Sequence, residues 1–155
     1  MKFKIHRAVA SVMGVGFLPV APGTWASLLG VALWYTAQAV FPSFGTIQWF
    51  LVLACIAAGL VSIQSVSKAW GADPSQVVID ELAGIWISCL MLPHQPAVLF
   101  AAFVFFRGFD ILKPMGIRKM ESIKGAPGVL LDDILAGLYA NVCVQVLLWS
   151  GVLKY

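Results

Sequence analysis

Acidic side chains are rare in this chain, and most of them adjoin long apolar stretches. Five of the seven acidic residues do so, namely Asp80, Glu81, Asp110, Asp132 and Asp133. A carboxylate near hydrocarbon is costly unless it pairs with a cation, lines a wet cavity or holds a metal. Because three separate segments each bring such a cluster, we expect a site that is assembled from several helices.

The segment FRGFDILKP (106–114) carries charges of alternating sign at intervals of three residues. Arg107, Asp110 and Lys113 therefore share one face of a predicted helix, which Pro114 ends. Two cations around a carboxylate suit a phosphate site, where the cations hold the anion and the carboxylate binds a metal or a proton. A ladder of salt bridges at a membrane interface explains the same pattern equally well.

Two pairs of adjacent carboxylates occur in VIDELAGIW and GVLLDDILAG. On a helix Asp80 and Glu81 point about 100° apart, so one can ligate a metal while the other supports it. An acidic first turn that complements the helix dipole is the alternative. Asp132 and Asp133 repel each other unless a cation is present, since their nearest basic neighbour in the sequence is Lys124. Clusters rich in oxygen and free of sulfur favour a hard cation, so these four carboxylates predict a metal site for Mg²⁺ before Ca²⁺ or Zn²⁺.

A fourth candidate element is the segment GVGFLPVAPGTWASLLG (14–30). Gly23 precedes a predicted helix for which Thr24 is a suitable N-cap, and free N–H groups at a helix start attract anions. Ser27 follows one turn later on the same side as Thr24. The segment lacks the Gly-Lys-Ser/Thr ending of a Walker loop, so a capped helix after a tight turn is the competing explanation. The residues alone favour the capped helix, and phosphate contacts from Gly23, Thr24 and Ser27 are the functional alternative.

The composition predicts a membrane-embedded chain. At 155 residues it has the length of one domain, which we assign to residues 1–155. It is 61% hydrophobic and 11% charged, with a mean hydropathy of +0.92, which leaves too few charges for a water-exposed surface. The net charge of +3 is too small to suggest a nucleic-acid partner.

The apolar periodicity predicts an all-α fold, as a polytopic membrane helical bundle with four to five membrane-embedded helices. A Gly/Pro-rich segment at 8–23 precedes them and is expected to be re-entrant or interfacial. The expected helices cover residues 25–40, 47–67, 77–92, 97–113 and 129–153.

The basic residues are distributed unevenly between the two sides of this bundle. With a cytoplasmic N-terminus, nine of the ten basic residues lie on the inner side, and Lys154 alone lies outside. That asymmetry follows the positive-inside rule. A rise of about 1.5 Å per residue places the three charged clusters at similar depths, near the cytoplasmic surface.

Four stretches follow one another in a characteristic order: PVAPGTWASLLG (19–30), VIDELAGIWI (78–87), FRGFDILKPMGIRKME (106–121) and GAPGVLLDDILAG (125–137). Together they resemble the phosphatidylglycerophosphatase A family of bacterial membrane phosphatases. The resemblance implies a Mg²⁺-dependent enzyme that converts phosphatidylglycerophosphate to phosphatidylglycerol and phosphate. It also implies a helical fold that works among the lipids of the inner membrane, with its active site facing the cytoplasm.

Under this interpretation, the carboxylates hold one or two Mg²⁺ ions and promote attack by water. Arg107 and Lys113 clamp the phosphate, and the turn at 23–24 supplies backbone N–H donors. The expected catalytic residues are Asp80, Glu81, Asp110, Asp132 and Asp133, and the expected metal ligands are Asp80, Glu81, Asp132 and Asp133.

Three other classes are weighed against it. They are another lipid-phosphate enzyme of the membrane, a small ion or proton transporter that uses the carboxylates, and a scaffold whose charged clusters only pin the helices. The gathering of charges at one membrane face, rather than at the midplane, argues against transport. The sequence leaves the oligomeric state open, a homodimer included.

Overall fold

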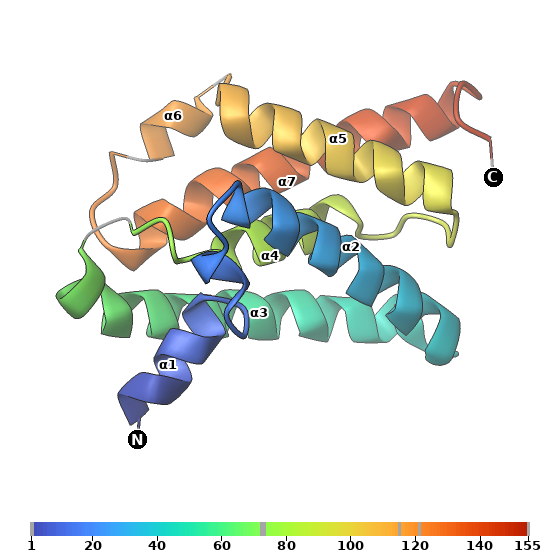
Figure 1. The fold of residues 1–155 in the computed structure, drawn as a ribbon. Helices are drawn as coiled ribbons and strands as arrows, with labels where there is room; N and C mark the ends of the chain where they lie inside the picture. Colours follow the sequence, from blue (N-terminus) through green and yellow to red (C-terminus); the bar gives the residue numbers. More distant parts are fainter. Residues whose placement is uncertain (1, 72–73, 115, 121, 155) are drawn as a thin grey trace.

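A computed structural model describes residues 2–71, 74–114, 116–120 and 122–154. Within these ranges the chain is entirely helical and contains no strand, so the prediction of an all-α fold is confirmed. The elements, shown in Figure 1, are α1 (Lys2–Ala10), the 3₁₀ turn η1 (Val15–Phe17), α2 (Pro22–Val40), α3 (Phe44–Trp70), α4 (Ile79–Ser88), α5 (Pro96–Leu112), α6 (Ile117–Met120) and α7 (Ala126–Trp149).

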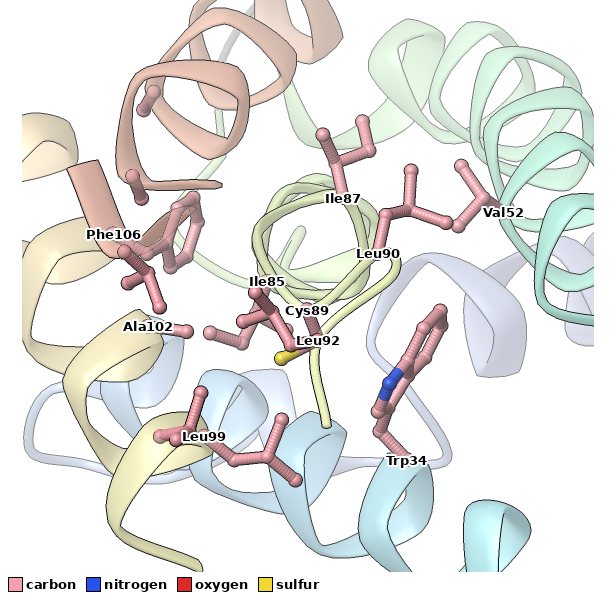
Figure 2. Close-up of a cluster of buried hydrophobic side chains, with 14 of the residues drawn as sticks. Trp34, Val52, Ile85, Ile87, Cys89, Leu90, Leu92, Leu99, Ala102 and Phe106 are labelled. Carbon is pink, nitrogen blue, oxygen red and sulfur yellow. The ribbon is translucent and has the colours of Figure 1, made fainter. Parts of the chain in front are cut away.

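Helix α4 forms the centre of the bundle, with α2, α3, α5 and α7 packed around it. Figure 2 looks along α4 and shows Trp34 from α2 and Val52 from α3 directed toward it. Leu99 and Phe106 approach it from α5, and both are buried. Because α4 is covered on all sides, its sequence reads as a nearly continuous apolar run.

Two glycines allow α4 and α7 to approach closely. A Cβ built on Gly137 would overlap the carbonyl oxygen of Gly84. A Cβ built on Gly84 would meet the ring of Phe106 and the carbonyl oxygen of Asp133. Small residues at such a crossing bring two helix backbones into contact. The crossing therefore holds Asp133 beside the first turn of α4.

Helix α4 is shorter than the expected span at 77–92. Where α4 ends, side chains of neighbouring helices form hydrogen bonds with its backbone. Asn141 Nδ2 donates to the carbonyl oxygens of Ser88 at 3.0 Å and of Leu90 at 2.8 Å. Gln48 Oε1 accepts the N–H of Met91 at 3.0 Å. A helix of ten residues is about 15 Å long, half of the ~30 Å hydrocarbon layer, so α4 alone cannot cross it.

Two helices of the described residues, α3 and α7, are long and apolar enough to cross a membrane. The most apolar stretches of these two helices have mean hydropathies of 2.1 and 1.5, and most residues in these stretches are not buried in the bundle. On α3, for example, Phe50 is 69% exposed and Leu53 is 63% exposed. The larger number of embedded helices, and a re-entrant or interfacial placement of residues 8–23, stay predictions.

Candidate active site

A cavity of about 810 Å³ lies where α2, α4 and α7 begin and α5 ends. The end of α5 and the start of α7 lie toward the left of Figure 1. The structure brings together every charged side chain that the sequence singled out, although they come from three different helices and one helix end. The predicted residues in the lining are Gly23, Asp80, Glu81, Arg107, Asp110, Lys113, Asp132 and Asp133.

Three carboxylates form a compact acidic cluster in this cavity. Asp80 and Glu81 lie in the first turn of α4 and Asp133 in the second turn of α7, and one oxygen of each lies within 4.8 Å of the others. Asp80 is 8% exposed and Asp133 is 3% exposed. In the described part of the chain, Asp80 Oδ1, Glu81 Oε2 and Asp133 Oδ1 are buried without a hydrogen-bond partner. Unpartnered buried oxygens that repel one another fit a hard divalent cation as their common ligand.

Asp132 lines the same cavity but does not belong to the three-carboxylate cluster. Lys113 Nζ donates to Asp132 Oδ2 at 2.7 Å. In the sequence the nearest basic neighbour of the Asp132–Asp133 pair is Lys124, whereas in the structure Lys113 reaches Asp132 from the end of α5, 19 residues earlier in the chain. Since successive helical side chains diverge by about 100°, the pair divides between two environments. Among the described residues, Asp132 Oδ1 has no hydrogen-bond partner. A role for Asp132 as a metal ligand stays a prediction.

Arg107 and Asp110 form the second charged pair of the cavity. Arg107 Nη1 lies 2.6 Å from Asp110 Oδ2 across one turn of α5. Arg107 Nε is buried, and no described residue accepts its hydrogen. Asp110 is close enough to Glu81 and Asp133 for its charge to act on both. Of the two alternatives that the sequence left open, the Arg107–Asp110 salt bridge is present, and phosphate binding by the same side chains stays a prediction.

Lys113 owes its position to the way α5 ends. It is the C-cap residue, with a left-handed backbone at φ 46°, and its N–H donates to the Phe109 carbonyl at 2.8 Å. Pro114 follows and prevents the helix from continuing. This abrupt end places the Lys113 side chain against α7 at Asp132.

The Gly-rich segment 14–30 differs from its prediction at the start of α2. The N-cap of α2 is Ala21, with φ 48°, and not Thr24, because Pro22 is favoured in the first turn of a helix. A Cβ on Gly23 would overlap the Glu81 carboxylate, so this glycine makes room for an acidic side chain. Ser27 Oγ donates to the Gly23 carbonyl at 2.8 Å and is buried. Neither Thr24 nor Ser27 is among the described lining residues, and their contact with phosphate stays a prediction.

One further cation lines the cavity. Lys124 precedes α7 and was considered in the sequence only as a distant neighbour of the Asp pair. Its position just before the motif GAPG (125–128), which opens a helix that carries two carboxylates, was the available signal. Lys124 is exposed, so it can meet an anion that enters from the aqueous side.

An acidic cluster that fits a divalent cation, with Arg107 and Lys113 in the same cavity, is the arrangement of an enzyme that acts on phosphate esters. Beside it, α3 and α7 are long and apolar enough to cross a membrane. The comparison with protein families agrees. The chain belongs to the phosphatidylglycerophosphatase A family, whose sequence model matches residues 8–148.

Three curated relatives cover most of the chain. A protein of Bacteroides thetaiotaomicron, whose name gives phosphatidylinositol-3-phosphatase as a provisional activity, is 40% identical over 91% of this chain and 92% of its own. Phosphatidylglycerophosphatase A of Haemophilus influenzae is 35% identical over 84% of this chain and 81% of its own. Phosphatidylglycerophosphatase A of Escherichia coli is 34% identical over 81% and 73%. No solved structure matches the chain.

Proposed function

We propose that this phosphatase hydrolyses phosphatidylglycerophosphate to phosphatidylglycerol and inorganic phosphate. The observation that carries the proposal is the single cavity in which the Asp80–Glu81–Asp133 cluster faces Arg107 and Lys113. Two relatives named phosphatidylglycerophosphatase A, at 35% and 34% identity, support the choice of substrate.

We further propose Mg²⁺ as the cofactor, held by Asp80, Glu81 and Asp133, with Asp132 as a candidate fourth ligand. All of these donors are carboxylate oxygens, which suits a hard cation better than a thiophilic metal. When bound, the cation supplies positive charge that stabilises the phosphoryl oxygens and makes a nucleophilic water more acidic.

The cationic side chains bind and orient the phosphate. Arg107 presents a planar fork of donors that matches two phosphoryl oxygens, and its ion pair with Asp110 holds the guanidinium in place. Lys113 contributes a second positive charge while Asp132 anchors its ammonium group. Lys124 at the rim attracts the anionic headgroup from the aqueous side.

Water is the proposed nucleophile. Its oxygen bonds to phosphorus and one of its protons passes to a carboxylate of the cavity, while the bond between phosphorus and the ester oxygen breaks. The same carboxylate then returns that proton to the leaving oxygen, which becomes the hydroxyl of phosphatidylglycerol. Glu81 and Asp110 are the candidates for the base. No histidine is found among the described lining residues, and Ser27 already donates its proton to a carbonyl, so a serine activated by histidine has no support here.

We propose that the chain lies in a bacterial inner membrane with this cavity at the cytoplasmic face. Lys113 and Lys124 line the cavity, whereas the connections 41–43 and 89–95 at the other end of the bundle carry no Lys or Arg. By the positive-inside rule, this distribution supports a cavity on the cytoplasmic side. Helices α2 and α5 would be embedded beside α3 and α7, with α4 enclosed between them.

Phosphatidylinositol 3-phosphate is the second candidate substrate, because the relative at 40% identity carries that activity in its name. It too is a phosphate monoester on a lipid headgroup, so the same side chains could act on it. The test compares phosphate release from the two lipids by the purified protein in detergent with Mg²⁺. A higher kcat/KM for phosphatidylglycerophosphate supports the proposal, and a higher value for the inositol lipid replaces the substrate while keeping the chemistry.

A further inference from the structure

A second hollow of about 370 Å³ lies between α2 and α5, on the outside of the bundle. These two helices pack against each other over part of their length. The lining is almost entirely apolar, unlike that of the active-site cavity. It consists of Leu28, Val31, Ala32 and Tyr35 from α2, and Pro96, Leu99, Phe100 and Phe103 from α5. We call this hollow the α2–α5 groove.

On α5 the groove leads directly to the charged residues of the active site. Phe103 lines the groove, and Arg107 and Asp110 line the active-site cavity. These three residues are spaced by four and then three positions, so they follow one another along a single face of the helix.

The same continuity exists on α2. Leu28 lines the groove and Ala21 lines the active-site cavity. Thr24 lies between them, four positions before Leu28 and three after Ala21, on the same face. Residues of the apolar groove and of the charged cavity therefore share one face on each of the two helices, with Thr24 between them on α2.

The dimensions fit one hydrocarbon chain. From Thr24 to Tyr35 the helix rises by roughly 16 Å, close to half of the ~30 Å hydrocarbon layer and thus to the depth of one leaflet. At the far end Tyr35 stacks on His94, with ring centroids 4.1 Å apart, which bounds the groove with polar groups. An occupant with a phosphate at one end and an apolar chain of leaflet length matches the polarity along this path.

We propose that the α2–α5 groove binds one acyl chain of the lipid phosphate whose headgroup occupies the active-site cavity. The inference rests on the proposed function, since it assigns a place to the apolar part of that substrate. By holding the chain in line with Arg107, the groove positions the phosphate over the acidic cluster. Its contribution is to substrate binding, so a defect should appear in KM more than in kcat.

The kinetic test uses the variant Ala32→Trp, whose larger side chain narrows the groove. We expect the ratio of kcat/KM for a long-chain over a short-chain phosphatidylglycerophosphate to fall by at least about tenfold, the loss that follows when roughly two methylene groups lose their apolar contact. Ala57→Trp, on an exposed face of α3, is the matched control and should leave the ratio unchanged. Phe100→Ala, which widens the groove at a 62% exposed position, should raise KM for the long-chain lipid and covers the case that Ala32→Trp does not fold.

A binding test separates this inference from the proposed reaction. A lipid phosphate with a diazirine at the end of one acyl chain is photolysed on the wild-type protein in EDTA, and the labelled peptides are identified by mass spectrometry. Labels on Tyr35, Phe100 or Phe103 that unlabelled lipid phosphate displaces, and phosphatidylcholine does not, support the groove even if turnover is absent. Labels spread evenly over the apolar exterior, or an unchanged chain-length ratio in both groove variants, would overturn it and leave only contact with bulk lipid.

Discussion

Lys113 Nζ lies 2.7 Å from Asp132 Oδ2 and so joins the end of α5 to the second turn of α7. The side chains are 22% and 10% exposed, which makes this a partly buried ion pair. By pairing with Lys113, Asp132 has a different environment from its neighbour Asp133, which lies with Asp80 and Glu81 in the acidic cluster.

This ion pair should be energetically coupled. We expect Lys113→Met and Asp132→Asn each to lower the free energy of unfolding by about 1–3 kcal/mol, because each leaves a partly buried polar partner unsatisfied. The double variant should lose clearly less than the sum of the two. Denaturant unfolding in detergent micelles measures all four proteins of the cycle. Additive losses would mean that the pair contributes no interaction energy.

Gly23→Ala should impair activity while preserving the fold. The added methyl group would occupy the space of the Glu81 carboxylate and displace it from Asp80 and Asp133. We expect Mg²⁺ affinity and kcat/KM to fall by about ten- to a hundredfold, as when a group that orients metal ligands is lost. The measurement is phosphate release as a function of Mg²⁺ concentration.

Gly45→Ala is the matched control for that variant. Gly45 lies at the start of α3, and a Cβ there meets no described atom within 4 Å. Alanine also suits a helix better than glycine, by up to about 1 kcal/mol. The control should keep full activity. Equal activity of the two variants would show that the space at Gly23 is not required by Glu81.

Gly137→Ala should destabilise the bundle. Its methyl group would collide with the Gly84 carbonyl and push α7 from α4, and backbone cannot yield as a flexible side chain does. A loss of about 1–3 kcal/mol is expected, as for other overpacked cores. Leu138→Ala, at the neighbouring 47% exposed position, should change stability far less in detergent. The comparison of thermal midpoints checks this, and a Gly137 variant as stable as the control would contradict the close crossing.

Arg107→Lys should weaken phosphate binding although it conserves the charge. Lysine cannot present two parallel donors to a phosphoryl group, and its single ammonium group cannot serve Asp110 and a phosphate with the separate N–H groups that arginine has. We expect kcat/KM to fall by about tenfold or more, with inorganic phosphate becoming a weaker product inhibitor. Arg118→Lys, at an exposed residue of α6, is the matched control. Equal inhibition constants for both variants would remove Arg107 from the phosphate site.

Much of the site could be predicted because charged residues are energetically unfavourable in apolar stretches and therefore stand out in the sequence. Carboxylates within apolar stretches are informative by themselves, and the helical period placed Arg107, Asp110 and Lys113 on one side. The structure brings these residues together with Asp80 and Asp133 in one cavity. The helical fold was also predictable, because long apolar runs without strand signals leave few alternatives to a helix.

The features that escaped prediction depend on partners distant in the sequence. Helix α4 stops at Ser88 where Asn141 supplies donors from α7, and local sequence around Ser88 contains no comparable stop signal. The start of α2 was misplaced because Thr24 is a good N-cap in isolation, whereas Pro22 begins the helix earlier. The partner of Asp132 lies 19 residues away, on another helix.

The central claim is that the Asp80–Glu81–Asp133 cluster holds the metal for phosphate release. The most direct test measures phosphate released from phosphatidylglycerophosphate by wild type, Asp133→Asn and Lys68→Gln, each with Mg²⁺ and with EDTA. Lys68 is exposed near the end of α3, so its variant controls for a change of charge outside the cavity.

We predict Mg²⁺-dependent release by wild type and Lys68→Gln, and a loss of at least about a hundredfold in Asp133→Asn that retains the wild-type helicity and thermal midpoint. Full activity of Asp133→Asn in Mg²⁺, or undiminished wild-type release in EDTA, would contradict the account.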